Sequence, residues 1–516
     1  MGTPSRLALT ACLLLVTSAR ATAAGPSDAA SLAIRAVDVD GGGVLLVDAE
    51  ALHRDILDGR LAIPLPDGGG VLVRDVTARD EGDVQHFHGG ADTALGRLPV
   101  VLTLSGESLW GTFPDEKGQR WTIATRGDEV AIQPDGGLHP SGVPRATDVL
   151  IPPRRKRQSG ATTLSDAEAA AIVAEGPVVI DLLALISSEL GGNAVAESQA
   201  RARYQHLVEV TNRAFADSGV PASLRIVAME FVAIPPLSSS RTSLSLITSN
   251  DASLGLDVHA LRDQRAADLV ALIRPYSPAA GACGIAWGNG FGLAPDSADP
   301  AYGYSVTHLD PCGVFVMAHE IGHNLGAHHD IETETKPDGR VDRGAYLDSH
   351  GQRQTAAPAF HTIMAYQKGT MPWIGRFSDP RAAQCEGQPC GVNGYADNRR
   401  TLALMAPRVA AFRSPPGTLH VDVGTIVEGD SGETEVALTI RHEGPVPAEG
   451  LRFQLAAVGE TATPGADFQP LALMDSASRG GSPCDSPSSF PTMIPSVVSA
   501  AASTSKVPRR PSIRSS

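Results

Sequence analysis

The chain has 516 residues, of which 42% are hydrophobic and 19% are charged, so it is long enough for two or three domains with real cores. It carries 42 Lys and Arg against 57 Asp and Glu, a formal net charge of −15, and no basic stripe outside short processing or tail segments. This balance argues against a nucleic-acid binder.

The first 23 residues have the pattern of an export signal. Arg6 supplies the positive start, residues 7–16 form the apolar core, and small residues at 21–23 provide a cleavage site. The apolar core is too short to span a bilayer, and no other stretch is long and apolar enough for a membrane helix. We therefore predict a secreted protein without a membrane span.

Residues 24–157 are predicted to form a β-rich unit, because short apolar runs alternate there with Gly, Asp and Pro turns. The runs lie at 43–47, 70–73, 99–104, 120–123 and 129–132. The unit ends in a Pro-flanked basic run that closes with Arg157, so cleavage before Gln158 would release it. The alternative is a charged linker. Residues 158–176 are predicted to be a linker that turns helical.

From residue 177 onward, strand and helix patterns alternate. Strands are predicted at 178–186, 224–228 and 267–273. Between the first two, apolar residues share one helical face: Tyr204, Leu207, Val208, Thr211 and Phe215. This alternation predicts an α/β fold in which helices cover a mixed sheet. The patterning fades past residue 326, which predicts an irregular lower subdomain and a cleft between it and the sheet.

Residues 319–329 place three imidazoles, one carboxylate and one glycine at informative spacings. His319 and His323 share a helical face, and Glu320 lies about 100° further round that helix. Gly326 can adopt a left-handed conformation that ends the helix and brings round His329 as a third ligand. Three protein ligands leave the fourth position of a zinc ion open for water, which is typical of a catalytic site. An inactive copy of such a site is the alternative.

This motif resembles that of the metzincin metallopeptidases, whose second signature is a methionine turn below the metal. Met364 lies in a matching segment, and Asp330 directly after the third His is the reprolysin-like variant. The resemblance extends over about 177–413 and is closest to the bacterial reprolysin-like group that includes the peptidyl-Asp metalloendopeptidases. It implies a metzincin fold, structural roles for Gly326 and Asp330, and one catalytic zinc ion.

The chain departs from reprolysins at Tyr366, which follows Met364-Ala365 where reprolysins usually have Pro after the Met. A phenol at this position could donate a hydrogen bond to a developing oxyanion. The alternative is that Tyr366 only packs beside the helix.

Four cysteines lie within the peptidase region, an even number, as a disulfide framework requires. We pair Cys283 with Cys312 and Cys385 with Cys390, which leaves Cys484 unpaired.

The order of β-rich unit, basic run and peptidase favours a propeptide and hence a zymogen. Residues 25–157 contain no Cys, so a cysteine cannot be the group that holds the zinc inactive. His86 and His88 offer imidazoles instead, although two surface histidines on a loop are the simpler interpretation.

Residues 418–472 alternate like strands and resemble a partial Calx-beta module, a β-sandwich. The resemblance allows calcium binding through acidic residues, whereas an isolated Glu428 or Asp467 is typical of a turn. The Ser-, Pro- and Ala-rich residues 473–516 are predicted to be a disordered tail.

We therefore predict a monomeric, secreted zinc metalloendopeptidase that acts on proteins or peptides, with Glu320 as the general base. A different class of protein remains as the alternative. It is a catalytically inert surface-binding or adhesion protein that uses the Calx-beta-like module.

Overall fold

The computed structural model describes residues 61–413, apart from 67–68, 107, 128, 137–147, 154–165, 370 and 384. It also describes residues 52, 54–55 and 58, and the backbone of seven strands outside this range. The predicted export signal, Arg157, Gln158, Glu428, Asp467 and Cys484 lie outside the described residues, so the predictions made for them stay predictions.

An antiparallel sheet, here called the N-terminal sheet, contains nine strands in the order β1-β2-β9-β8-β7-β6-β5-β4-β3. The strands are β1 (Ile34–Val39), β2 (Gly42–Val47), β3 (Ala62–Pro64), β4 (Gly70–Glu81), β5 (Val84–Thr93), β6 (Gly96–Ser105), β7 (Ser108–Pro114), β8 (Arg120–Arg126) and β9 (Glu129–Pro134). Its core includes Leu102, Leu109 and Phe113. The predicted β-rich character of this region is thus present.

A second sheet, here called the central sheet, has the order β10-β14-β15-β13-β11-β12. Its strands are β10 (Val149–Leu150), β11 (Val178–Ser187), β12 (Ala222–Val232), β13 (Leu269–Arg274), β14 (Gly284–Trp287) and β15 (Tyr304–His308). All neighbours pair in parallel except β14 and β15, which are antiparallel. The fold is therefore α/β with a mixed sheet, as predicted.

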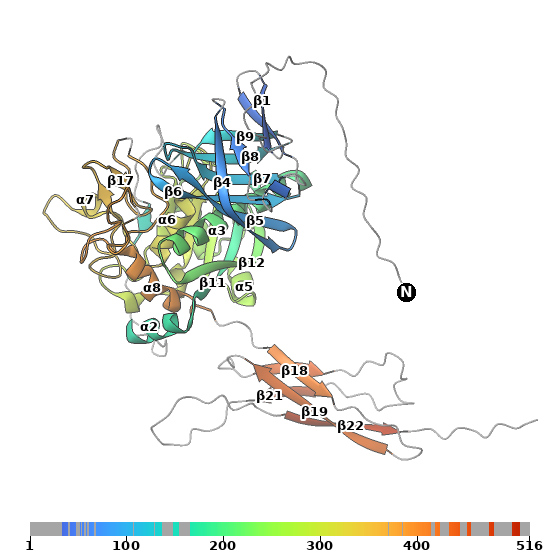
Figure 1. Cartoon of the computed structure of the whole chain (residues 1–516). Coiled ribbons are helices and arrows are strands. Elements are labelled where there is room, and N and C mark those ends of the chain that lie inside the picture. The colour runs from blue at the N-terminus through green and yellow to red at the C-terminus, as the bar shows by residue number, and fades with distance from the viewer. Residues whose placement is uncertain are drawn as a thin grey trace, which may run out of the picture.

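Helices cover both faces of the central sheet (Figure 1). The helices of the described residues are α2 (Asp166–Glu175), α3 (Ala194–Asp217), α4 (Ser240–Ser249), α5 (Val258–Gln264), α6 (Val316–Asn324), α7 (Ile331–Glu334) and α8 (Asn398–Val409). Short 3-10 helices lie at Ser188–Leu190, Ala252–Leu254, Pro295–Ser297 and Pro300–Tyr302. Among the described residues, no helix is long and apolar enough to cross a bilayer.

The central sheet buries both faces because successive side chains of a strand point to opposite sides. On β11, Leu182 packs in the cluster formed with α3, α6 and α8, and Leu183 packs in the cluster formed with α4 and α5. The helical face predicted between residues 204 and 215 is buried on α3. A core on both sides makes the sheet a rigid base for α6.

Between α6 and α8 the described part of the chain is mostly irregular, as predicted. Its two short strands, β16 (Arg353–Gln354) and β17 (Phe360–His361), pair in antiparallel fashion. Gly326 has a φ of +80°, in the left-handed region that favours glycine, and it ends the α6 segment. This turn directs the chain back toward the sheet.

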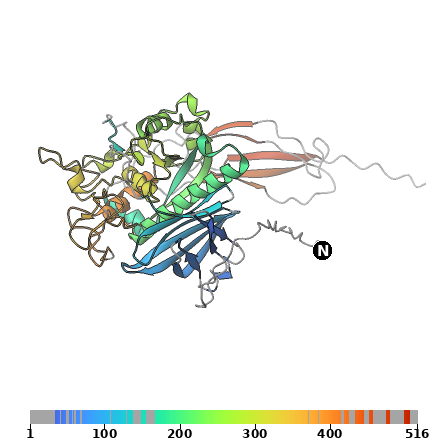
Figure 2. The ribbon, with the colours of Figure 1, turned by 90° about the horizontal axis from the view of Figure 1, so that it is seen from above.

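The N-terminal sheet packs against α3, as Figures 1 and 2 show from two directions. Glu209 of α3 accepts from Arg79 Nη2 at 2.6 Å and lies 2.5 Å from His88 Nε2. His206 of α3 contacts two hydroxyls of the N-terminal sheet, Thr103 Oγ1 at 3.1 Å and Thr112 Oγ1 at 2.9 Å. The N-terminal sheet is therefore joined to the peptidase region by buried polar contacts as well as by apolar packing.

The expectation that His86 and His88 are surface residues on a loop is wrong. Both lie on β5, His86 is only 2% exposed, and its Nδ1 lies 3.1 Å from Thr103 Oγ1. The strand is long enough to carry these imidazoles into the contact with α3, where hydroxyl and carboxylate partners offset the cost of burying them. Their packing against α3 also makes them part of the contact between the N-terminal sheet and this helix.

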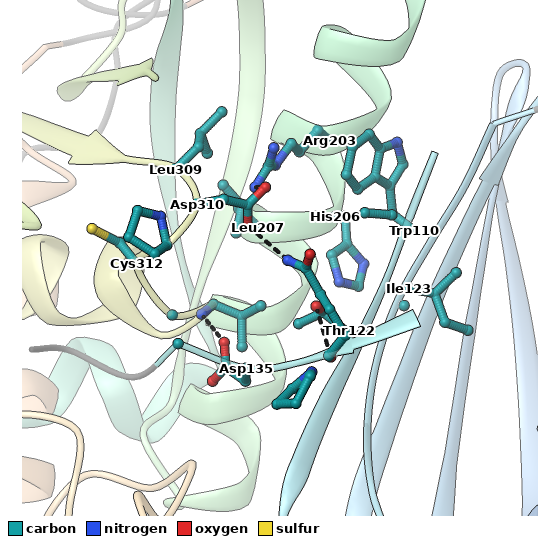
Figure 3. Close-up of a pocket in the computed structure, with 18 of the residues that line it drawn as sticks. Trp110, Thr122, Ile123, Asp135, Arg203, His206, Leu207, Leu309, Asp310 and Cys312 are labelled. Atoms are coloured by element: carbon teal, nitrogen blue, oxygen red, sulfur yellow. Dashed lines mark hydrogen bonds and ion pairs between the residues drawn. The ribbon is translucent and has the colours of Figure 1, made fainter. Parts of the chain in front are cut away.

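A cavity of about 400 Å³ lies at the same junction. In Figure 3, Arg203 and His206 of α3 face it together with Trp110 of the N-terminal sheet and Asp310 of the loop before α6. The carboxylate of Asp310 pairs with Arg203 Nη2 at 3.0 Å, and Asp135 Oδ1 accepts from Val314 N at 3.0 Å. The N-terminal sheet therefore also contacts the segment that leads directly into α6.

Burial, followed by the positive charges of His86 and Arg203, lowers the pKa of His206 from 6.5 to about 3. When the N-terminal sheet separates from α3, His206 would become exposed and its pKa would return to about 6.5. At a pH between about 3 and 6.5, the exposed His206 would therefore bind a proton that the buried His206 does not. Separation of the N-terminal sheet from α3 is therefore favoured as the pH falls below about 6, by up to about 1.4 kcal/mol per pH unit. We expect lower stability to urea at pH 5 than at pH 7. His206→Gln should reduce that pH dependence, and an unchanged dependence would contradict this assignment.

Both predicted disulfides are present. Cys283, at the start of β14, is joined to Cys312 before α6, and Cys385 is joined to Cys390. The first bridge closes a loop with a sequence separation of 29, and the second closes one of only 5. The first therefore fixes β14 relative to α6.

Loss of the first bridge should destabilise the protein more than loss of the second, because a longer loop has more entropy in the unfolded chain. Loop closure predicts about 3.5 kcal/mol for the Cys283–Cys312 bridge and about 2 kcal/mol for the other. Thermal unfolding of Cys283→Ser/Cys312→Ser, with Cys385→Ser/Cys390→Ser as the matched control, measures the difference. A larger effect in the control would contradict the prediction.

Five further strands are described after the peptidase region. They are β18 (Thr418–Val423), β19 (Glu433–Glu443), β20 (Leu451–Leu455), β21 (Met474–Ser478) and β22 (Val498–Ser505). β19 pairs with β18 and β22, and β20 pairs with β21. β21 and β22 lie in residues 473–516, and the disordered tail proposed there stays a prediction.

Candidate metal centre

The structure brings His319, His323 and His329 together. The first two project from α6, and the turn at Gly326 returns the chain so that the third meets them. Nε2 of His323 lies 3.1 Å from Nε2 of His319 and 3.1 Å from Nε2 of His329. For a tetrahedral zinc ion with Zn–N bonds of about 2.0 Å, neighbouring ligand atoms are separated by about 3.3 Å. The spacing of the imidazoles therefore fits one ion.

The hydrogen-bond partners of the Nδ1 atoms determine whether the Nε2 atoms have lone pairs free to bind a metal ion. Nδ1 of His319 lies 2.8 Å from the carbonyl oxygen of Ile363, and Nδ1 of His323 lies 2.9 Å from that of Ala327. A carbonyl oxygen only accepts, so each Nδ1 carries the hydrogen and each Nε2 of the neutral ring has a lone pair. Lone pairs that converge at 3.1 Å repel each other unless a cation lies between them.

His329 is held in the same tautomer by Glu334. Its Nδ1 lies 2.6 Å from Glu334 Oε1, and Glu334 is 8% exposed at the end of the short helix α7. Carboxylates that accept from the remote nitrogen of a metal-binding imidazole orient the ring and raise its basicity. Sequence reasoning missed Glu334, because its distance from the metal ligands depends on how α7 folds back.

Asp330 starts α7 and connects it to the methionine turn. Its carboxylate accepts from Thr333 N at 3.0 Å and from Tyr366 N at 3.0 Å, and it pairs with Arg353 at 2.9 Å. Met364 is fully buried below α6, where a Cβ added at Gly322 would lie 2.5 Å from its sulfur. These contacts place the segment that carries Met364 directly below the three imidazoles.

Tyr366 stacks on the candidate ligands. Its ring centroid is 4.3 Å from that of His329 and 6.2 Å from that of His319, and the side chain is 8% exposed. Burial, and then the nearby charge of Asp148, raises the pKa of Tyr366 well above its usual value, so the phenol keeps its proton. Tyr366 is thus placed beside the centre, as both sequence interpretations allowed.

Glu320 is fully buried on α6, and neither carboxylate oxygen has a hydrogen-bond partner among the described residues. It packs against β14 at Gly284, where an added Cβ would lie 2.1 Å from Oε1. Burial, and then the charge of Asp148, raises the pKa of Glu320 well above its usual value. The positive charge of a bound metal ion would oppose both effects and favour the ionised carboxylate that a general base requires. Sequence reasoning also missed Gly284, because nothing in its local sequence indicates what it faces.

A fourth side chain joins the centre from far upstream. The Asp148 carboxylate is 1% exposed and lies 2.9 Å from His329 Nε2, 3.4 Å from His319 Nε2 and 3.8 Å from His323 Nε2. Together these four residues are arranged so that their ligand atoms could hold one metal ion. The sequence had suggested an open fourth position, whereas in this structure a carboxylate lies there.

Residues 177–399 match the family described as metallo-peptidase family M12B, reprolysin-like. The chain contains a reprolysin-like metallopeptidase domain. This family implies a metal ion, which agrees with the converging lone pairs.

Relatives of the chain include peptidyl-Asp metalloendopeptidases of three bacteria. The protein from Pseudomonas aeruginosa is 31% identical over 51% of this chain and 45% of its own length. The one from Stenotrophomonas maltophilia is 26% identical over 68% of this chain and 78% of its own length, and the one from Xanthomonas campestris is 27% identical over 61% and 70%. The chain thus spans less than half of the Pseudomonas relative.

Solved structures resemble the chain only weakly. The crystal structure of metalloproteinase-II from Bacteroides fragilis covers 56% of this chain and 84% of its own, with a TM-score of 0.32 and 12% identity. A match this weak gives no information about the fold or function of the chain.

Proposed function

We propose that the chain is a secreted zinc-dependent metalloendopeptidase that is made as a zymogen. The observation that carries this proposal is the convergence of three Nε2 lone pairs at the spacing of a tetrahedral ion, above the methionine turn. Imidazole nitrogens in this number and geometry suit zinc, with His319, His323 and His329 as its ligands.

When bound, zinc supplies a Lewis acid that polarises a peptide carbonyl and lowers the pKa of water. Glu320 takes a proton from the attacking water and later passes it to the leaving amine. Its burial against Gly284 supports this role, because a carboxyl group without hydrogen-bond partners gains most by accepting that proton. The phenol of Tyr366, which stacks on His329, donates a hydrogen bond to the developing oxyanion.

Two measurements on the processed protein test this function. Elemental analysis should find one zinc per chain, and a peptide-library digest should show internal cleavage that stops when zinc is chelated. The same digest would show whether bonds next to Asp are preferred, as the name of the relatives suggests. A processed, folded protein with zinc but without cleavage of any peptide would support the inert binding protein instead.

The zymogen proposal predicts where the active form begins. Because the basic run ends at Arg157, we expect the N-terminus of the active enzyme near Gln158, and N-terminal sequencing or mass spectrometry can locate it. An active form that starts before residue 100 would retain most of the N-terminal sheet and would contradict the proposal.

A further inference from the structure

Asp148 and strand β10 precede α2 in the chain, yet they lie at the metal centre. β10 adds to the edge of the central sheet beside β14, in parallel. Its backbone carbonyls accept from that edge: Asp148 O from Ala286 N at 2.8 Å and Leu150 O from Gly288 N at 2.8 Å. An extended peptide that binds to a sheet does so through such edge groups. Residues 148–150 therefore occupy the edge that a substrate strand would use.

The Asp148 carboxylate faces the Nε2 atoms, which are the ring nitrogens that would bind a metal ion. Each Nδ1 has its own acceptor, so with a metal ion bound each ring would use its Nε2 lone pair and would offer the carboxylate no N–H group. A carboxylate buried against three lone pairs would be strongly disfavoured without a cation among them. Its distances of 2.9 to 3.8 Å from the Nε2 atoms place it at the fourth corner of the coordination site.

The N-terminal sheet is firmly attached near this segment. Arg79 and His88 contact Glu209, and Asp135 accepts from Val314 N shortly before α6. These contacts hold the N-terminal sheet on the peptidase region, and Asp148 is tethered to that sheet by the chain. Tethering of this kind raises the effective concentration of the Asp148 carboxylate at the three imidazoles.

We propose that Asp148 is the fourth metal ligand in the intact chain, and that with β10 it keeps the metallopeptidase latent. This inference rests on the proposed function. Asp148 takes the position at which water would be activated, and β10 covers the edge of β14. The propeptide thus uses a carboxylate where a cysteine was excluded by the sequence.

The test uses the intact chain in a Glu320→Gln background, which prevents self-cleavage in every sample. Co²⁺ is bound in place of zinc, and its visible spectrum is recorded with and without Asp148→Ala. A small hydroxamate is then titrated into both proteins. Asp83→Ala, at an exposed aspartate in the turn between β4 and β5, is the matched control, and Asp148→Asn serves if the Ala variant fails to fold.

We expect Asp148→Ala to change the Co²⁺ spectrum and to tighten hydroxamate binding at least about tenfold, because the tethered ligand no longer competes. Asp83→Ala should match the parent in both measurements. Metal bound with the same spectrum and the same hydroxamate affinity in parent and Asp148→Ala would overturn this inference alone. Absence of bound metal from all variants, including the processed wild type, would overturn the proposed function and this inference with it.

Discussion

The Glu320→Gln variant should bind zinc normally and hydrolyse peptides at least about a hundredfold more slowly than the processed wild type. The amide keeps the size of the side chain, so its packing against Gly284 is retained and only the proton acceptor is lost. Peptide hydrolysis and zinc content, measured on the same samples, check both parts of this expectation.

His323→Ala is the contrasting variant. It removes one of three ligands and should lose zinc together with activity, whereas Glu320→Gln should lose only activity. If Glu320→Gln kept more than about a hundredth of wild-type activity, Glu320 would not be the general base.

Gly284→Ala should reduce kcat/KM by about a hundredfold or more without loss of zinc. A Cβ at this position would lie 2.1 Å from Glu320 Oε1, 2.6 Å from Cδ and 2.7 Å from Cγ, so the carboxyl group must move. Displacing a catalytic group by about 1 Å typically costs about a hundredfold in rate. The three imidazoles do not contact Gly284 in this way, which is why metal content should be unchanged.

Ile285→Val is the control for this variant. Ile285 is on the same strand but packs in the cluster that includes Leu183 and Leu244, on the face of the sheet away from α6. It should cost about 1 kcal/mol of stability and leave activity close to wild type. Equal activity losses in Gly284→Ala and Ile285→Val would mean that β14 acts through general packing.

The sequence predicted the parts of the centre that depend on short spacings. His319 and His323 are one helical turn apart, and Gly326 lies close enough for its backbone preference to bring His329 into place. Both disulfides also followed, because the even number of cysteines in the region divided into two pairs in chain order. Such features are encoded locally, so their prediction requires no knowledge of the tertiary packing.

The remaining parts depend on contacts between distant segments. Asp148 reaches the imidazoles only because β10 pairs with β14, and no residue-type pattern near position 148 indicates that pairing. His86 was misplaced for a similar reason, since its burial requires α3 to pack on the N-terminal sheet. Glu334 and Gly284 are likewise part of the site only through a tertiary contact, Glu334 with His329 and Gly284 with Glu320. Periodicity and motif spacing contain no information on such partners.

The composition of the central sheet has a consequence for activation. β10 precedes the basic run, whereas the other five strands of the sheet follow it. A cut at Arg157 would therefore leave one sheet assembled from two separate polypeptides, and the upstream piece would become a reversible inhibitor. Its release would then obey mass action, so freshly cut enzyme should gain activity on dilution and lose it when concentrated. Dilution of the cut protein into a large volume would therefore drive the upstream piece off the enzyme.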